Sequence, residues 1–360
     1  MESVEMMFDL SFYGGKRVFV TGYTGFKGAW LCRVLVNAGA IVTGYSLAPP
    51  TEPNLFDIAG LSEFMTEIRG DIRNYSTLKE AFETVKPEIV LHLAAQTIVR
   101  TSYEHPVITY ETNVMGTVNL LECVRTAQVP VRSVVNITTD KVYQNNEWCW
   151  GYRENEPLDG YDPYSNSKSC SELVTHSYAY SFFHDNRIAI STARAGNVIG
   201  GGDFARDRII PDCVRAATEG RPIIVRNPNS IRPYQHVLEP VFAYLMIAQR
   251  QYSDQNLSGW YNVGPDDCDC VTTGELVKMF CNEWGPGASA EYGGEIEAPH
   301  EAHCLKLDST KLKTTFAWRP RWHIPEAIEK TVAWTRVWKQ NGNIPAEMDR
   351  QIQEYLEDRT

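Results

Sequence analysis

The sequence lacks long hydrophobic runs and a regular cysteine pattern. No stretch approaches the ~18 to 20 consecutive apolar residues that span a bilayer, and the N-terminus carries no apolar stretch of signal-peptide length. We therefore expect a cytoplasmic protein that does not bind membranes. The 9 cysteines are irregularly spaced in a chain of 360 residues, so we expect reduced thiols and no disulfide framework.

Basic residues are fewer than acidic ones, and this excludes another class of partner. The chain has 34 Lys and Arg against 45 Asp and Glu, which gives a formal net charge of −11. Nucleic acids attract net positive charge, so they are not expected as partners. Metal binding is not expected either, because residues 300–304 and the pair Cys268 and Cys270 lack the spacing of a strong metal-binding motif.

Strand-like and helix-like segments alternate along the first half of the chain. Short, apolar, β-branched runs predict strands at 17–21, 40–45, 89–93, 134–138 and 188–193. The segments between them are long enough for crossover helices, such as residues 107–127. This pattern predicts an α/β fold with a doubly wound, parallel Rossmann-type sheet.

The second half of the chain has a less regular texture, with scattered glycines and prolines. We expect residues 1–195 to form a dinucleotide-binding domain that carries the catalytic residues. Residues 196–360 are expected to form mainly a smaller α/β lobe that binds substrate, with some segments returning to the first domain. Thr272 and Glu275 have the spacing of a capping box, and a last helix is predicted to begin near Pro325.

A glycine-rich turn joins the first predicted strand to the first helix. Gly22, Gly25 and Gly28 stand in GYTGFKG, where a pyrophosphate could lie on backbone N–H groups at the positive end of the helix dipole. The alternative is a turn that only packs the helix on the strand. No acidic residue follows the second strand, and no Lys or Arg occurs between Arg33 and Arg69, so NAD is favoured over NADP.

Two further segments follow predicted strands at the same edge of the sheet. Asp71 and Ile72 follow a candidate third strand, and residues 93–96 follow the fourth. Dinucleotides bind at this carboxyl edge, so these residues are expected to contact the cofactor. Loop formation and the packing of small residues are the alternative explanations.

A tyrosine and a lysine stand four residues apart after a proline. If Pro163 opens a helix, Tyr164 and Lys168 lie on one face, one turn apart. A nearby ammonium lowers the pKa of a tyrosine, which brings proton exchange with a substrate alcohol closer to neutral pH. The alternative is an ordinary exposed helix face.

A hydroxyl, a carboxylate and an ammonium close the predicted strand at 134–138. These side chains belong to Thr139, Asp140 and Lys141. Such groups at a strand end are solvated, paired or catalytic. Together with the glycine turn and the tyrosine–lysine pair, they resemble the extended short-chain dehydrogenase/reductase superfamily, whose catalytic set is Thr or Ser, Tyr and Lys.

Longer phrases resemble the CDP-glucose branch of the sugar-nucleotide 4,6-dehydratases, from about residue 14 to about residue 340. The phrases are VTGYTGFKGAWL, HLAAQTIVRTSYEHP with TNVMGT, TTDKVYQN, ARAGNVIGGGDFARDRIIPD, and IRPYQHVLEP followed by EAHCLKLDSTKL. Lys141 stands where the dTDP branch typically carries Glu, which indicates the CDP branch.

The resemblance implies an NAD-dependent lyase that converts CDP-glucose to CDP-4-keto-6-deoxyglucose and water. Tyr164, assisted by Lys168 and Thr139, would take the C4 hydroxyl proton while a hydride moves to NAD, and the hydride would later return to C6. Asp140 would protonate the departing C6 hydroxyl. Lys141 would act as the C5 base, or would instead form a salt bridge to Asp140.

The resemblance also implies two sets of binding residues. The cofactor-binding residues are Gly22, Thr24, Gly25, Phe26, Lys27, Gly28, Asp71, Ile72, Leu93, Ala94, Ala95, Gln96, Thr112, Tyr164, Lys168 and Asn197. The substrate-binding residues are Arg100, Tyr103, Thr139, Asn197, Arg208, Arg226, Arg232 and His236. Arginine suits a diphosphate because its guanidinium can donate two parallel hydrogen bonds, whereas a solvated surface position is the alternative for each arginine.

Superfamily relatives commonly dimerise through helices, here residues 107–127 and the helix with Tyr164. This implies a homodimer or a higher homo-oligomer. The product would supply deoxysugars for surface polysaccharide such as lipopolysaccharide O-antigen. Three alternatives stay open: a dehydratase for another sugar nucleotide, a sugar-nucleotide 4-epimerase, and a non-catalytic dinucleotide-binding protein.

Overall fold

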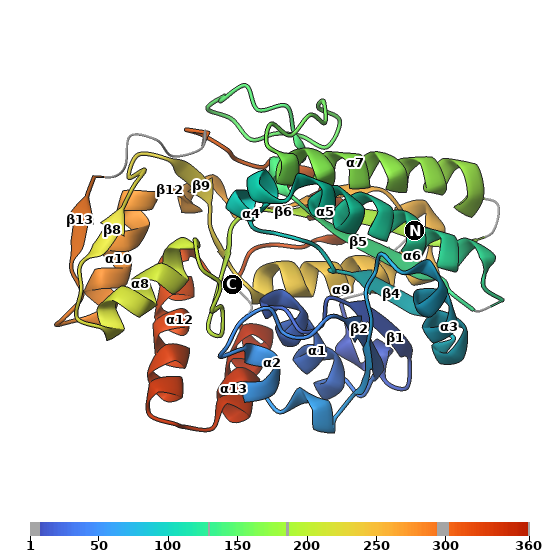
Figure 1. Cartoon of the computed structure of the whole chain (residues 1–360), viewed down its shortest axis with the longest axis horizontal. Coiled ribbons are helices and arrows are strands. Elements are labelled where there is room, and N and C mark those ends of the chain that lie inside the picture. Colours follow the sequence, from blue (N-terminus) through green and yellow to red (C-terminus); the bar gives the residue numbers. More distant parts are fainter. Residues whose placement is uncertain (1–7, 129, 185–186, 294–301, 359–360) are drawn as a thin grey trace, which may run out of the picture.

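The computed structural model describes residues 8–128, 130–184, 187–293 and 302–358. A seven-stranded sheet with helices on both faces forms the larger lobe, and a smaller lobe lies at one end of it (Figure 1). Its strands lie in the order β11-β6-β5-β4-β1-β2-β3, and all neighbours are parallel, which confirms the predicted doubly wound fold. The strands are β1 (Arg17–Thr21), β2 (Ile41–Ser46), β3 (Thr66–Arg69), β4 (Ile89–His92), β5 (Ser133–Thr139), β6 (Ala189–Ala195) and β11 (Trp260–Val263).

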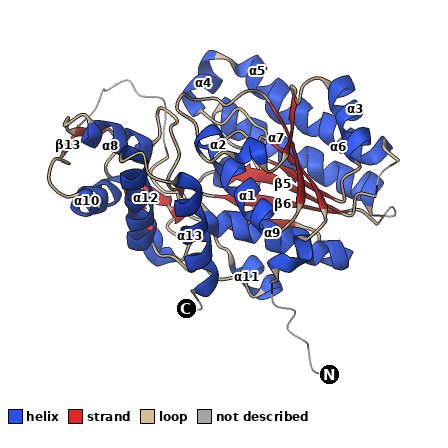
Figure 2. Ribbon diagram, turned by 90° about the horizontal axis from the view of Figure 1, so that it is seen from below, coloured by secondary structure: helices blue, strands red, loops and turns tan. Residues whose placement is uncertain are grey.

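Alternating strand side chains divide the core of the larger lobe into two layers. In β1, Val18 and Val20 belong to one hydrophobic cluster, and Phe19 belongs to a cluster on the other face. Figure 2 shows the strands of the sheet enclosed between helices on both faces. The first layer contains α1 (Phe26–Asn37), α9 (Leu238–Ser253) and α13 (Ile344–Glu357), and the second contains α3 (Tyr75–Val85), α6 (Gly116–Thr126) and α7 (Pro163–Tyr178).

The smaller lobe has its own hydrophobic core, in which Ile210, Val225, Phe280 and Ile328 are buried. The capping box predicted at Thr272 is present at the start of α10. The helices of this lobe are α8 (Ile209–Thr218), α10 (Thr273–Trp284) and α12 (Ile324–Lys339). Its short strands are β7 (Val198–Ile199), β8 (Ile223–Val225), β9 (Ile231–Pro233), β10 (Gln235–His236), β12 (Cys270–Thr272) and β13 (Ala290–Tyr292).

The later part of the chain also contributes to the larger lobe. Helix α9 packs against β5 and β6, and β11 pairs with β6. The prediction that the helix near Pro325 is the last one is wrong, because α13 follows it and packs against α1. Asn343 caps α13 and Pro345 lies in its first turn, a pattern that predicts a helix start. The functional division at residue 195 stays a prediction.

The predicted crossover at 107–127 is three helical pieces in sequence. These are α5 (Pro106–Tyr110), a π-helical segment η3 (Glu111–Met115) and α6. The other short helices are α2 (Leu55–Ile58), α4 (Val99–Glu104), α11 (Thr310–Phe316), η1 (Leu10–Tyr13), η2 (Leu61–Glu63), η4 (Asp140–Val142), η5 (Ala179–Phe183), η6 (Gln255–Leu257) and η7 (Asp267–Asp269). Within the described part of the chain, no helix is long and apolar enough to cross a membrane.

Candidate active site

The glycine turn between β1 and α1 brings backbone close to backbone. Gly22 has a φ of 73°, and a Cβ at this position would lie 2.6 Å from the Ala94 nitrogen. A Cβ on Gly28 would lie 2.2 Å from the Gly22 carbonyl oxygen. Gly25 is the N-cap of α1 and supplies no side-chain hydrogen bond, so no capping side chain occupies the first N–H groups of the helix. The turn therefore fits a diphosphate at the positive end of α1.

Hydroxyl groups connect this turn to the neighbouring strand ends. Thr24 Oγ1 lies 3.0 Å from Ser46 Oγ at the end of β2. The backbone nitrogen of Ala94 donates a hydrogen bond of 3.2 Å to Thr21 Oγ1. The predicted cofactor residues of the turn and of the loop after β4 are thus brought together at the carboxyl edge of the sheet, where Phe26 and Lys27 begin α1.

The loop after β4 is held by the π-helical segment. Asn113 Oδ1 accepts a hydrogen bond of 2.8 Å from the Gln96 nitrogen, and Asn113 Nδ2 donates to the Gln96 carbonyl at 3.0 Å. Asn113 also donates to Ser167 of α7 at 2.8 Å. Thr112 directly precedes Asn113 in this π-helical segment.

Asp71 and Ile72 lie after β3, as predicted. The half-buried carboxylate of Asp71 accepts hydrogen bonds from Arg73, which lower its pKa. Ile72 is buried, and a Cβ on Gly116 would approach its side chain to 2.7 Å. Ile72 therefore contributes to packing as well as to this edge of the sheet.

The end of β2 has a cation beside it, so the expectation of a cation-free neighbourhood is wrong. Arg69 pairs with Ser46 across the sheet, and its Nη1 donates to the Leu47 carbonyl at 3.1 Å. The guanidinium forms an ion pair of 2.8 Å with Glu67. Strand pairing brings together residues that sequence spacing separates, which is why the sequence interval was misleading.

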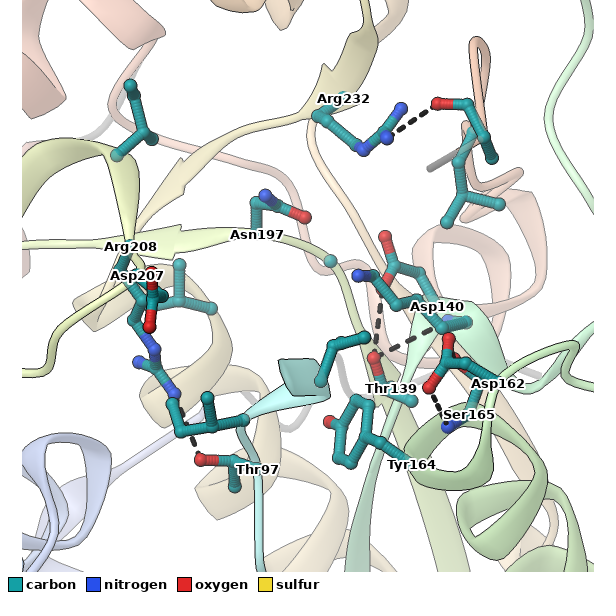
Figure 3. Close-up of a pocket in the computed structure, with 18 of the residues that line it drawn as sticks. Thr97, Thr139, Asp140, Asp162, Tyr164, Ser165, Asn197, Asp207, Arg208 and Arg232 are labelled. Carbon is teal, nitrogen blue, oxygen red and sulfur yellow. Dashed lines mark hydrogen bonds between the residues drawn. The ribbon is translucent and has the colours of Figure 1, made fainter. Parts of the chain in front are cut away.

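A cavity of about 860 Å³ lies beside this edge and is lined by residues of both lobes. Figure 3 shows Thr139, Tyr164 and Arg208 facing the same space. Most of the predicted catalytic and substrate residues line this cavity. They are Arg100, Thr139, Asp140, Lys141, Tyr164, Asn197, Arg208, Arg226 and Arg232, together with Lys27 of the glycine turn.

Helix α7 begins at Pro163, as predicted, and places Tyr164 and Lys168 on one face. Asp162 caps the helix and accepts a hydrogen bond from the Ser165 nitrogen at 3.0 Å. Both Tyr164 and Lys168 are buried, and Lys168 Nζ donates to the Ile137 carbonyl at 3.1 Å. The lysine is thus tied to strand β5, close to the tyrosine.

Burial decides the electrostatics of this pair. It raises the pKa of Tyr164 to about 12, against the opposing influence of the Thr139 hydroxyl. Burial, together with the positive charge of Lys27, lowers the pKa of Lys168 to about 7. The expectation that Lys168 lowers the pKa of Tyr164 is therefore wrong for this arrangement, because loss of solvent outweighs the neighbouring charges.

Asp140 is a buried carboxyl group at the edge of the cavity. It is 2% exposed, and its Oδ1 accepts a hydrogen bond of 2.9 Å from Thr139 Oγ1. Its Oδ2 is buried and has no hydrogen-bond partner in the described part of the chain. Burial raises its pKa, which is the direction that a general acid needs. Half-buried Lys141 lines the same cavity, and its positive charge acts against the effect of burial on the pKa of Asp140.

Three arginines line the cavity around two aspartates. Arg208 Nη1 lies 3.0 Å from Asp203 Oδ2. Asp207 lies 3.8 Å from Arg226 and 3.7 Å from Arg100. These ion pairs leave the guanidinium groups partly exposed to the cavity, which suits a diphosphate.

Arg232 and Asn197 approach the cavity from β9 and from the residue before β7. Arg232 is buried, and its Nη2 donates to the Ala302 carbonyl at 2.6 Å. Asn197 accepts a backbone hydrogen bond from the Gln235 nitrogen, and its side chain faces the cavity (Figure 3). Both side chains are therefore positioned by the smaller lobe.

Two predicted substrate residues do not line this cavity. Tyr103 lies on α4 and is 44% exposed. His236 is fully buried, with its ring centroid 6.2 Å from that of Trp30 and 4.9 Å from that of Trp322. The indole rings cover the imidazole, so a substrate contact by His236 is a wrong prediction.

The residues considered for metal binding are separated or occupied by other contacts. His300 and Glu301 lie outside the described residues. Cys268 lies near Asp269 and His323, not in a site with Cys270. His323 Nδ1 lies 2.8 Å from one Asp269 oxygen, and the Ile324 nitrogen donates to the other, so Asp269 holds the start of α12.

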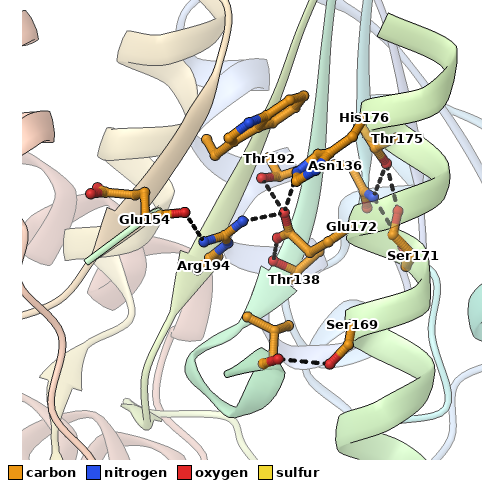
Figure 4. A network of polar contacts seen from close by, with 12 residues as sticks. Asn136, Thr138, Glu154, Ser169, Ser171, Glu172, Thr175, His176, Thr192 and Arg194 are labelled. Carbon is orange, nitrogen blue, oxygen red and sulfur yellow. Dashed lines mark hydrogen bonds and ion pairs between the residues drawn. The ribbon is translucent and has the colours of Figure 1, made fainter. Parts of the chain in front are cut away.

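Sequence reasoning missed a buried polar network behind the catalytic face (Figure 4). Glu172 of α7 and Arg194 of β6 form a fully buried ion pair of 2.9 Å. Glu172 also accepts hydrogen bonds from Thr138 and from Thr192. The spacing of four from Lys168 to Glu172 is the signal that could have identified it.

Comparison with known proteins places this geometry in a family. The GDP-mannose 4,6-dehydratase family model matches residues 19–331. The chain belongs to the GDP-mannose 4,6-dehydratase family.

This member of the dehydratase family is similar to other sugar-nucleotide enzymes over nearly its whole length. It is 49% identical to the CDP-glucose 4,6-dehydratase of Salmonella typhimurium, over 97% of this chain and 99% of that protein. The UDP-glucose 4-epimerase of Thermus thermophilus, solved with NAD, has a TM-score of 0.77 at 26% identity over 89% of this chain and 99% of that one. The dTDP-glucose 4,6-dehydratase of Streptomyces venezuelae has a TM-score of 0.76 at 21% identity, over 91% of this chain and 98% of that one, and shows the shared fold.

Proposed function

We propose that this 4,6-dehydratase converts CDP-glucose to CDP-4-keto-6-deoxyglucose and water. The observation that carries this proposal is the 49% identity, over 97% of the chain, to the CDP-glucose 4,6-dehydratase of Salmonella typhimurium. The buried carboxyl group of Asp140 beside the tyrosine and lysine adds support, because elimination of water needs a proton donor that an epimerase does not.

NAD is the proposed cofactor, with its diphosphate on the turn formed by Gly22, Gly25 and Gly28. The close backbone approaches in this turn support the assignment, as does the NAD in the related Thermus thermophilus epimerase. When bound, NAD would supply a positively charged nicotinamide that can accept a hydride from C4 and later return it to C6.

Tyr164 is proposed to take the proton of the C4 hydroxyl. Its hydroxyl is buried in the cavity wall next to Thr139, and burial raises its pKa to about 12. The positive charge of a bound nicotinamide would lower this pKa and favour the deprotonated form that a base needs. Lys168 is held by the Ile137 carbonyl and supports the same step with its ammonium. The products of this step are a C4 ketone and a protonated Tyr164.

Asp140 and Lys141 are proposed to remove water from C5 and C6. The C4 ketone acidifies the C5 proton, which Lys141 is proposed to accept. Asp140 donates its proton to the departing C6 hydroxyl, which leaves as water and produces a C5–C6 double bond. A hydride then returns to C6, and Lys141 returns a proton to C5. The C4 ketone is therefore retained in the product.

The arginines of the cavity are proposed to bind the sugar nucleotide. Arg208, Arg226 and Arg232 present guanidinium groups that suit the two phosphates, and Asn197 lies between Arg208 and Arg232 in Figure 3. Arg100, from the loop after β4, would approach the hexose. A role for Tyr103 would require a contact outside the cavity described above.

A homodimer is the proposed assembly, with a second copy of the chain covering the outer face of α5, α6 and α7. Val107 and Leu173 are 67% and 53% exposed on this face, and Ile108 and Met115 are also exposed. Such apolar exposure on neighbouring helices fits a helix-to-helix interface.

The 9 free cysteines support a cytoplasmic location. The product is proposed to serve deoxysugar synthesis for surface polysaccharide.

The experiment that tests this proposal compares four substrates under identical conditions. Purified protein and NAD are incubated separately with CDP-, dTDP-, GDP- and UDP-glucose, and mass spectrometry follows the loss of one water. The matched control is Asp140→Asn, which keeps the size of the side chain and removes the acid. Turnover confined to CDP-glucose supports the proposal, turnover of another nucleotide overturns the substrate assignment, and no water loss from any overturns the activity.

A further inference from the structure

Four side chains spaced by four residues share one face of α7. They are Tyr164, Lys168, Glu172 and His176. The first two belong to the proposed chemistry, but Glu172 does not reach the cavity. Its carboxylate is fully buried and forms an ion pair of 2.9 Å with Arg194, which is also fully buried. A buried ion pair is weak evidence for stability, because desolvation offsets much of the attraction, so this pair calls for another explanation.

The hydrogen bonds of Glu172 connect α7 to the end of β5. Thr138 Oγ1 donates to one carboxylate oxygen, and Thr192 Oγ1 donates to the other at 2.7 Å. Thr138 directly precedes Thr139, whose hydroxyl donates to Asp140. Thr138 and Thr139 both line the cavity, but the Thr138 hydroxyl donates to Glu172 of α7 while the Thr139 hydroxyl donates to Asp140. Glu172 therefore holds the backbone that carries the proposed acid.

Glu172 also provides the negative charge that faces Lys168. The titratable groups around Lys168 are Lys27 at the start of α1, His92 at the end of β4, and Glu172 one helical turn away. Lys27 and burial disfavour the ammonium, whereas Glu172 favours it. His92 is neutral, because burial lowers its pKa to about 3.

The groups that face Glu172 come from three elements. They are His176 of α7, Arg194 of β6, and Tyr143, which follows η4 and donates its hydroxyl to Asn262. Arg194 of β6 is the counter-ion of Glu172, and Figure 4 shows the carboxylate between this guanidinium and helix α7. Glu172 therefore has one cationic neighbour on the sheet, Arg194, and another one helical turn away on its own helix, Lys168.

We propose that Glu172 is a positioning residue of the dehydratase reaction, which orients Thr139 and Asp140 through Thr138 and places a negative charge one helical turn from Lys168. This inference rests on the proposed function. It assigns Glu172 no contact with the substrate. Its two effects are separable, because one acts through a hydroxyl group and the other through charge.

The first test compares Thr138→Val with Thr192→Val in the NAD-loaded enzyme. Both changes preserve side-chain shape and remove one hydroxyl from the same carboxylate, but only Thr138 adjoins the proposed catalytic residues. We expect Thr138→Val to lower kcat about tenfold to a hundredfold with KM changed less than about twofold, because small displacements of reacting groups are costly. Thr192→Val should change kcat less than about threefold while lowering Tm as much as Thr138→Val does.

The second test measures the pH dependence of kcat in Glu172→Gln/Arg194→Gln. This double variant removes both buried charges together, and the amide introduced at position 172 keeps an oxygen that accepts from Thr138. Loss of the negative charge next to Lys168 should move the alkaline limb of the profile down by about one pH unit. Thr138→Val keeps the charge, so its alkaline limb should not move.

The outcomes separate this inference from the proposed function. Equal losses of kcat in Thr138→Val and Thr192→Val overturn the orienting role, and an unmoved alkaline limb in the folded double variant overturns the charge role. In both cases a wild-type enzyme that converts CDP-glucose leaves the proposed function standing. A wild-type protein that converts no sugar nucleotide overturns the proposed function and this inference together.

Discussion

Replacing Asp140 with asparagine should stop water loss and at the same time stabilise the fold at neutral pH. The carboxyl group is 2% exposed, and one of its oxygens has no hydrogen-bond partner in the described part of the chain. Asparagine has nearly the same size and can still accept the hydrogen bond from Thr139, but it has no acidic proton. Loss of a positioned general acid costs about 10²- to 10⁴-fold in rate, or about 3 to 5 kcal/mol in the barrier.

The effect on stability follows from the sign of the pKa shift. Burial raises the pKa of Asp140 in the folded state above its unfolded value of about 3.9. The contribution of such a group to folding is fully present below the unfolded pKa and is lost as the pH rises through the folded pKa. The Asp140→Asn protein should therefore match the wild type in urea unfolding near about pH 4 and become increasingly more stable toward about pH 8.

Rapid mixing with CDP-glucose measures the two chemical steps separately. C4 oxidation is followed by the absorbance of the reduced nicotinamide, and water loss is followed by mass spectrometry of quenched samples. In Asp140→Asn the reduced cofactor should accumulate while the dehydrated product does not form. Equal loss of both steps, turnover within about tenfold of the wild type, or a variant less stable at about pH 8 than the wild type would refute the reasoning.

Three further predictions address the base, the cofactor turn and the assembly. Tyr164→Phe should lower kcat by about 10³-fold or more while NAD stays bound, and unchanged turnover would reject the assigned base. Gly28→Ala should weaken NAD binding measured by calorimetry, because its Cβ would lie 2.2 Å from the Gly22 carbonyl oxygen, whereas unchanged affinity would show that the turn adapts. Leu173→Glu should convert a dimer to a monomer in analytical ultracentrifugation, and an unchanged dimer would exclude this face as the interface.

Local patterns predicted much of the fold and of the cavity. The glycine turn, the helix opened by Pro163 and the capping box at Thr272 depend on neighbouring residues, and the structure confirms each of them. Long-range pairing was not predictable in this way. Arg69 lies beside the end of β2 only because β3 pairs with β2, and His236 is covered by two indole rings from distant segments.

The chemistry of the site shows the same limit. The spacing of Tyr164 and Lys168 predicted that they share a helix face, but it did not predict that burial would raise the pKa of the tyrosine to about 12. Burial is a property of the whole packed lobe and not of the motif. Glu172 of α7 was missed for the related reason that its partner Arg194 lies on a different element, strand β6, 22 positions along the chain.

Transfer of a label within the hexose tests the central claim most directly. CDP-glucose carrying deuterium at C4 is mixed with unlabelled CDP-glucose and converted by the NAD-loaded protein in ordinary water. We expect a product that has lost one water and carries the deuterium at C6 of the same molecule. A product that has lost the deuterium to solvent, or an unchanged sugar nucleotide, would contradict it.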